Sequence, residues 1–231
     1  MEEGRRVVRR FRLGAAGLER WFGHGARCRV LLESSTESEW VARYLEGLGH
    51  EVVVADPNYA AMYAERTRRV KTDNRDAEAL FEANRTGIYR PAHRRSEAQR
   101  RVIELLGIRD SLVRARTRWI NVMRSMLRRE GHCVPSGSAE CFLARVGALG
   151  LPLTLRQRLD PYAALWDGLK QQITGLDRQI EQLSQQDPRV MLLQSAPAIG
   201  WLRPAAFVAV IDEPRRFRKA QKSIYCVRTK E

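Results

Sequence analysis

Between residues 161 and 183, apolar residues alternate steps of four and three, and this spacing constrains the fold of the chain more than any other feature. The seven positions are Tyr162, Trp166, Leu169, Ile173, Leu176, Ile180 and Leu183. Such a heptad seam predicts a helix that packs along a second helix, because a stripe this narrow suits a helical partner better than a broad globular core. Asp160 and Pro161 are expected to cap and begin this helix.

A second long helix is predicted from Ser96 to Glu130. Its apolar residues recur as pairs seven residues apart: Leu105/Leu106, Leu112/Val113, Trp119/Ile120 and Met126/Leu127. We expect either an antiparallel hairpin between the two helices or self-association of the chain into a homo-oligomer through the seam. Packing into an ordinary core is the alternative, because the seam is short for a stand-alone coiled coil.

The N-terminal part has the alternating pattern of an α/β domain. Residues 28–33 (CRVLLE) and 51–57 (EVVVADP) are apolar runs of strand length. The segment between them predicts an amphipathic helix that ends at Gly49. Strand, helix and strand at this spacing predict a βαβ unit.

Positive charge is both abundant and clustered. The net charge is +14, and only five of the 41 basic residues are Lys. Residues 94–129 hold eleven Arg against three acids, which leaves a local excess of +8 (eleven minus three). Because Arg pairs with phosphate in a bidentate manner, this excess favours a nucleic acid partner, either DNA or RNA. The alternative is that a GC-rich genome raises the Arg content of the chain. The predicted phosphate-binding residues are Arg66, Arg68, Arg69, Lys71, Arg114, Arg118, Arg124 and Arg128.

Other classes of protein are disfavoured. The four cysteines show no CxxC spacing, so neither a zinc site nor a disulfide framework is indicated. No signal peptide is apparent at the start of the sequence, and no uncharged run approaches the length of a membrane span. These features predict a reduced, cytoplasmic protein without membrane partners.

Three acidic residues suggest a metal site. Glu33 ends a predicted strand, and Asp73 and Asp76 lie three residues apart on a helix predicted over residues 71–87. Carboxylates from a strand end and a nearby helix suit Mg²⁺, which takes oxygen ligands and can promote phosphodiester cleavage. The alternative is structural: Asp73 and Asp76 could cap the helix, and Glu33 could pair with an Arg.

Several strings resemble the DEDD transposases of the insertion sequence 110 family. These are LLESSTESEW with its following strand, KTDNRDAEAL, RPAHRRSEAQR, VPSGSAE and PAIGWLRPAAFVAVIDEPRRF. The resemblance implies a resolvase-type RNase H-like fold with four Mg²⁺-binding acids, in the order Asp, Glu, Asp, Asp. Glu33 matches the Glu, and Asp73 and Asp76 match the last two Asp. It also implies a Ser nucleophile in the C-terminal domain and, in some members, a structured guide RNA.

The chain also departs from that family pattern. No Asp precedes Asp56, so the first acid has no counterpart, and Ser223 lies in the wrong context for the nucleophile. We therefore expect a chain truncated at both ends that binds nucleic acid without cleaving it. A regulatory protein that associates with full-length transposase and an unselected pseudogene product are the rival hypotheses.

The expected fold class is α/β plus all-α. Residues 1–92 are predicted to form a partial RNase H-like domain, residues 93–187 a helical coiled-coil arm, and residues 188–231 the start of a C-terminal helical domain. In this last part the PAIG turn (197–200) is typical of helix-hairpin-helix elements, which present backbone N–H groups to a phosphate.

Overall fold

The computed structural model describes residues 10–59, 73–197 and 199–217, without the side chains of residues 73–75. The chain divides into two compact units, Met1–Arg94 and Arg95–Glu231. The N-terminal unit contains α1 (Ala15–Phe22), β1 (Arg29–Glu33), α2 (Ser38–Gly47), β2 (Glu51–Ala55) and α3 (Asp73–Thr86). The C-terminal unit contains α4 (Glu97–Arg129), α5 (Phe142–Gly147), α6 (Leu153–Gln185), α7 (Pro188–Gln194), α8 (Leu202–Ile211) and the short 3₁₀ helix η2 (Pro214–Arg216).

The predicted βαβ unit is confirmed. Strands β1 and β2 are parallel, with a register that runs from Arg29 opposite Glu51 to Glu33 opposite Ala55. Helix α2 connects the strands, and Gly49 ends the turn after it with a φ of 91° that favours glycine. The outer edge of β2 is met by the segment after α3, which forms an antiparallel bridge between Ala55 and Pro91.

The two faces of this sheet are covered by different helices. Val30 and Leu32 pack with α1 and α2 around the buried residues Leu18, Val41 and Leu45. Leu31, between them in the strand, packs on the opposite face with Ala83 and Leu80 of α3. Because successive strand residues point to opposite faces, α3 covers the face to which Leu31 belongs.

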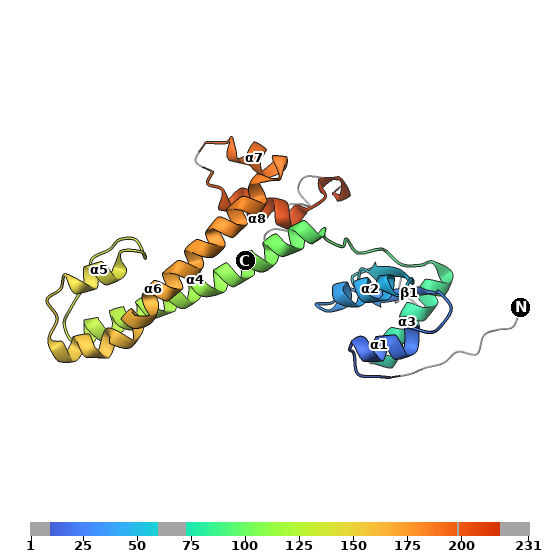
Figure 1. Cartoon of the computed structure of the whole chain (residues 1–231), viewed down its shortest axis with the longest axis horizontal. Helices are drawn as coiled ribbons and strands as arrows, with labels where there is room; N and C mark the ends of the chain where they lie inside the picture. The colour runs from blue at the N-terminus through green and yellow to red at the C-terminus, as the bar shows by residue number, and fades with distance from the viewer. Residues whose placement is uncertain (1–9, 60–72, 198, 218–231) are drawn as a thin grey trace, which may run out of the picture. The chain divides into compact units, whose positions relative to one another are not determined.

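The C-terminal unit is built on an antiparallel pair of long helices, α4 and α6, which lie side by side in Figure 1. Their direction follows from two clusters: Leu127 packs with Leu155 and Leu159 at one end, and Val102 packs with Ile180 at the other. The residues of the predicted seam face this interface, since Trp166, Leu169, Ile173 and Ile180 are all buried. An antiparallel packing of the two helices is thus observed, whereas self-association of the chain stays a prediction.

The predicted start of the helix that carries the heptad seam is wrong. Helix α6 begins at Leu153, so Pro161 lies inside it rather than at its first position. A proline in a helix interior has no N–H to donate and costs about 3 kcal/mol. Leu155 and Leu159, which are 2% and 4% exposed, offset this cost. Burying each of them contributes about 1.5–3 kcal/mol, and this burial requires the additional helical turns.

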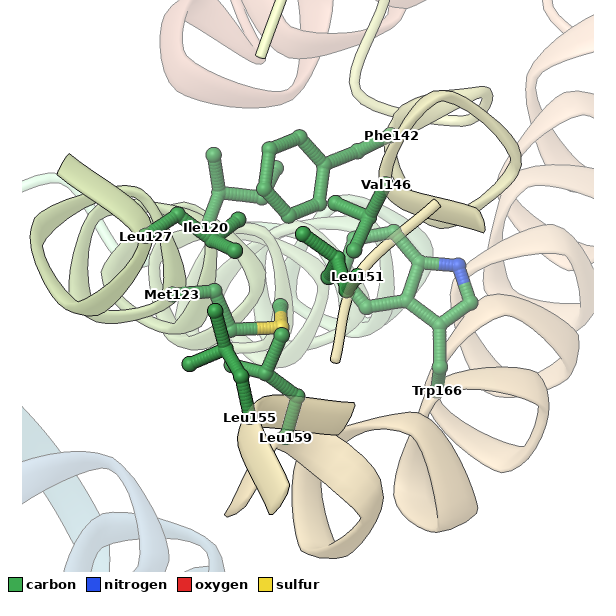
Figure 2. Close-up of a cluster of buried hydrophobic side chains, with 9 residues drawn as sticks. All are labelled: Ile120, Met123, Leu127, Phe142, Val146, Leu151, Leu155, Leu159 and Trp166. Carbon is green, nitrogen blue, oxygen red and sulfur yellow. The ribbon is translucent and has the colours of Figure 1, made fainter. Parts of the chain in front are cut away.

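Figure 2 shows the larger of the two clusters, where α5 closes over the α4–α6 pair. Phe142, the first residue of α5, is fully buried, and its ring centroid lies 6.1 Å from that of Trp166. Met123 and Leu127 of α4 are also fully buried there. The short helix α5 therefore anchors the connection between α4 and α6 to the core.

At the other end of the pair, a polar clamp joins α4 to the segment after α8. The buried carboxylate of Asp212 accepts hydrogen bonds from the backbone N–H of Ser96, at 2.8 Å, and from its hydroxyl, at 2.9 Å. Ser96 is the N-cap of α4, where a negative charge is favourable. Asp212 adopts a φ of 55°, a conformation that residues other than Gly rarely take.

Asp187, the N-cap of α7, extends this polar contact. It accepts hydrogen bonds from Gln99 of α4 at 3.1 Å and from the guanidinium of Arg189 at 2.6 Å. The hydrogen bonds from Arg189 hold the pKa of Asp187 below its ordinary value. The carboxylate of Asp187 thus connects α7 to α4 in its charged form.

Replacing Asp187 with Asn should lower the stability of the C-terminal unit at neutral pH by about 1–2 kcal/mol, because charge-assisted hydrogen bonds are lost. A lowered pKa means that the stabilisation is present above the unfolded-state pKa, near 4, and is lost as the pH falls through the folded-state pKa. Urea denaturation at a series of pH values between 7 and 3 measures this effect. The difference between the two proteins should be largest at pH 7 and shrink as the pH falls below about 4; a constant difference would contradict the assigned cause.

Candidate functional site

Glu33 lies at the carboxyl end of β1. The residues of this strand are half-buried or exposed, and Glu33 itself is half-buried. Since Glu33 follows Leu31 by two positions, the alternation of a strand directs both toward the face covered by α3. The carboxylate is therefore on the correct side of the sheet to meet α3.

Asp76 lies in the first turns of α3 and is buried, with 9% of its surface exposed. It precedes Leu80 by four positions and Ala83 by seven, so the three residues share one face of the helix. Leu80 and Ala83 pack toward the sheet, which places Asp76 on the sheet-facing side of α3. Asp73 is the first residue of α3, but its side chain lies outside the described part, as do Arg66, Arg68, Arg69 and Lys71.

Glu33 and Asp76 thus belong to elements that pack on each other, and a further hydrogen bond, from the Asn84 amide to the Arg29 carbonyl (3.3 Å), joins α3 to β1. Both side chains offer the oxygen donors that a hard cation such as Mg²⁺ takes. Among the side chains that are described, no group of three His, Cys, Asp or Glu residues is close enough to hold a metal ion. The donor chemistry fits Mg²⁺, and the convergence of three carboxylates stays a prediction.

Part of the positive charge of α4 and the segment before it is neutralised within the protein. Arg94 binds Glu39 at 3.0 Å and also Glu46, whose hydrogen bonds contribute most to raising the pKa of Arg94. Arg109 pairs with Asp177 of α6, Arg114 with Asp110, and Arg116 with Glu140, the last two at 2.7 and 2.9 Å. Four of the eleven arginines therefore have acidic partners, so the arginines of this region repel one another less than the local excess of charge suggests.

Part of the remaining charge lies in the C-terminal half of α4. Arg118, Arg128 and Arg129 are exposed, and no salt bridge to an acid is found for them among the described residues. We call these three residues the arginine stripe. Arg118 and Arg129 are about three helical turns apart and so lie on the same face of α4, and Arg128 lies next to Arg129. Arg128 and Arg129 also line a shallow cleft of about 490 Å³ with Arg124.

The four predicted arginines of α4 differ in their surroundings. Arg118 and Arg128 belong to the stripe, whereas Arg114 is paired with Asp110. Arg124 is half-buried, and its guanidinium lies over the ring of Phe142, 5.4 Å from the centroid. Arg129 was not among the phosphate-binding residues predicted from the sequence. It is exposed and directly follows Arg128, and this adjacency is the signal that could have identified it.

The family model described as Transposase, of the DEDD type in the insertion sequence 110 family, matches residues 2–131. This match covers more than half of the chain and includes Glu33, Asp73, Asp76 and the arginine stripe. The chain belongs to the DEDD transposase family of insertion sequence 110. The resemblance inferred from the sequence motifs is thereby confirmed.

Curated proteins similar to this transposase-family chain come from several bacteria. A probable family 20 transposase of Pseudomonas aeruginosa is 29% identical over 223 residues, which cover 94% of this chain and 65% of that protein. The transposase for insertion sequence element IS1328 of Yersinia enterocolitica is 26% identical over 82% of this chain and 57% of its own length. The transposase for IS1111A of Coxiella burnetii is 22% identical over 84% and 54%, respectively.

This member of the DEDD transposase family spans between half and two thirds of the length of these relatives. Across the part of the chain that the structure describes, no helix combines the length and the apolar character needed to cross a membrane.

Proposed function

We propose that this chain binds DNA through the arginine stripe of α4 as part of insertion-sequence transposition. The observation that carries the proposal is a set of three exposed arginines in the C-terminal half of α4 that have no acidic partner among the described residues, whereas Arg109, Arg114 and Arg116 of the same helix are paired with acids. Arginines that contact phosphate contribute affinity that does not depend on base sequence. Membership of a transposase family supports DNA as the polyanion.

We further propose that the N-terminal unit is a partial RNase H-like domain in which Glu33, Asp73 and Asp76 hold Mg²⁺. Bound Mg²⁺ would stabilise the charge that develops on a phosphodiester during strand cleavage. The position of Glu33 on the α3 face of the sheet, together with the buried carboxylate of Asp76, supports this arrangement. Because no Asp precedes Asp56, the family's first acid has no counterpart in this sequence, and the metal would lack one carboxylate.

The expected behaviour of the 231-residue chain is therefore DNA binding without cleavage. Fluorescence anisotropy with labelled duplex DNA should show an affinity that falls steeply with salt, with a slope of about −0.9 in log K per phosphate contact. A nicking assay on supercoiled plasmid with Mg²⁺ should show no product above background. Salt-independent binding would contradict the first half of the proposal.

A nicking activity would contradict the expected absence of cleavage, provided that this chain and not a contaminating nuclease causes it. Glu33→Gln and Asp76→Asn are the matched controls, since each keeps the size of the side chain and removes the charge. Nicking that disappears in both variants would establish a functional metal site in spite of the missing Asp. A structured RNA bound at least tenfold more tightly than the duplex would replace DNA as the preferred partner of the stripe.

A further inference from the structure

Three segments of the N-terminal unit meet at His50, which lies between Gly49 and the first residue of β2. Its side chain is buried, at 6% exposure, and its ring packs edge-on against Phe22 with centroids 5.6 Å apart. The Nε2 atom lies 2.8 Å from the backbone carbonyl oxygen of Phe22. Because a carbonyl oxygen only accepts hydrogen bonds, Nε2 carries the proton and donates to it.

The other ring nitrogen faces Cys28. The backbone N–H of Cys28 donates to Nδ1 at 3.2 Å, which requires a lone pair on Nδ1 in the neutral ring. The Sγ atom of Cys28 lies 3.4 Å from the same nitrogen. The thiol can act as a second donor to the same lone pair of Nδ1, and the Phe22 carbonyl fixes the ring in the orientation that receives it.

Cys28 is accessible to reagents in solution. It is exposed, so a small reagent can reach it, whereas the ring of His50 is buried.

We propose that Cys28 and His50 form a nucleophile–base pair, which makes Cys28 a site of oxidation by hydroperoxides. A nucleophile, a base within hydrogen-bond reach and a third group that orients the base are the features of an activated thiol. In the reaction the thiol proton moves to Nδ1, and the sulfur attacks one oxygen of the peroxide. The O–O bond breaks and the departing oxygen takes up the proton, which leaves a sulfenic acid and, for hydrogen peroxide, water.

The size of the effect is limited by a competing contact. When Nδ1 takes up the thiol proton, it can no longer accept the hydrogen bond from the backbone N–H of Cys28. Positioned bases commonly accelerate reactions by about 10²–10⁴-fold. We expect a smaller gain here, about tenfold, because proton transfer gives up this hydrogen bond.

The test uses the chain's own cysteines as controls. The full chain is treated with hydrogen peroxide in the presence of dimedone, which traps sulfenic acids, and labelling of each cysteine is followed by peptide mass spectrometry. Cys133 and Cys141 are also exposed and lie outside the N-terminal unit. Labelling of Cys28 should be about tenfold faster than that of either control. Equal rates at the three cysteines would overturn the proposal without any variant.

His50→Gln separates the base from a structural role. The Gln amide can donate to the Phe22 carbonyl and accept from the Cys28 N–H, but it cannot take up a proton. In this variant the rate at Cys28 should fall to that of Cys133 and Cys141, while their rates stay unchanged. An unchanged rate at Cys28, in a variant whose circular dichroism matches that of the parent chain, would show that His50 only holds the fold together.

Discussion

Replacing Arg118, Arg128 and Arg129 together with Ala should weaken DNA binding about 100-fold at moderate salt. Each lost phosphate contact is expected to remove about one unit from the slope of log K against log salt concentration, and therefore about three units in total. The loss should be the same for unrelated duplex sequences, because contacts with the phosphate backbone do not read bases. Fluorescence anisotropy over a series of salt concentrations measures both quantities.

A matched control removes the same charge elsewhere. Arg178, Arg203 and Arg215 are exposed in the same unit, on α6, α8 and η2. If the stripe is the binding surface, replacing these three with Ala should change the affinity only slightly, whereas net charge alone would predict equal losses in both triple variants. Equal losses would mean that binding follows the overall charge of +14 rather than the stripe.

Replacing Phe142 with Ala should destabilise the C-terminal unit by about 3–5 kcal/mol, the range for removing a fully buried aromatic ring. Three effects add to this loss: the ring fills the space beside Trp166, it begins α5, and it lies under the guanidinium of Arg124. Without it, α5 loses its main contact with the α4–α6 pair. Urea denaturation followed by far-ultraviolet circular dichroism measures the change.

Phe207→Ala is the matched control for this substitution, because Phe207 of α8 is 37% exposed. Its loss should cost under about 1 kcal/mol, since little apolar surface leaves the core and water already reaches the site. Similar costs for the two variants would show that the cluster in Figure 2 does not hold the unit together.

The sequence alone predicts the elements that depend on local pattern. The strands β1 and β2, the intervening α2 and the two long helices all follow from hydrophobic spacing, and Ser96 and Gly87 mark helix ends as expected. The start of α6 could not be predicted in this way. Pro161 is a strong local signal for a helix start, and it is overridden by leucines whose burial depends on α4 and α5.

The charge pattern shows the same limit. Arg109 and Arg116 look like the other arginines of α4 in the sequence, but their acidic partners lie 68 and 24 residues away. Only the packing of the helices shows which arginines are neutralised and which are exposed. For the acidic residues, the sequence predicts that Glu33 ends a strand and that Asp76 lies on a helix. Which face of the sheet this helix covers follows only from the packing of Leu80 and Ala83 with Leu31.

The hydrogen bonds between Asp212 and Ser96 impose an order on biosynthesis. The ribosome makes Ser96 116 residues before Asp212, so α4 and α6 can pair while α4 still lacks this carboxylate at its N-terminal end. The clamp closes only after α8 has left the exit tunnel. A nascent chain arrested before Asp212 should therefore expose the first turn of α4 to proteolysis, and a chain arrested well after it should protect that turn.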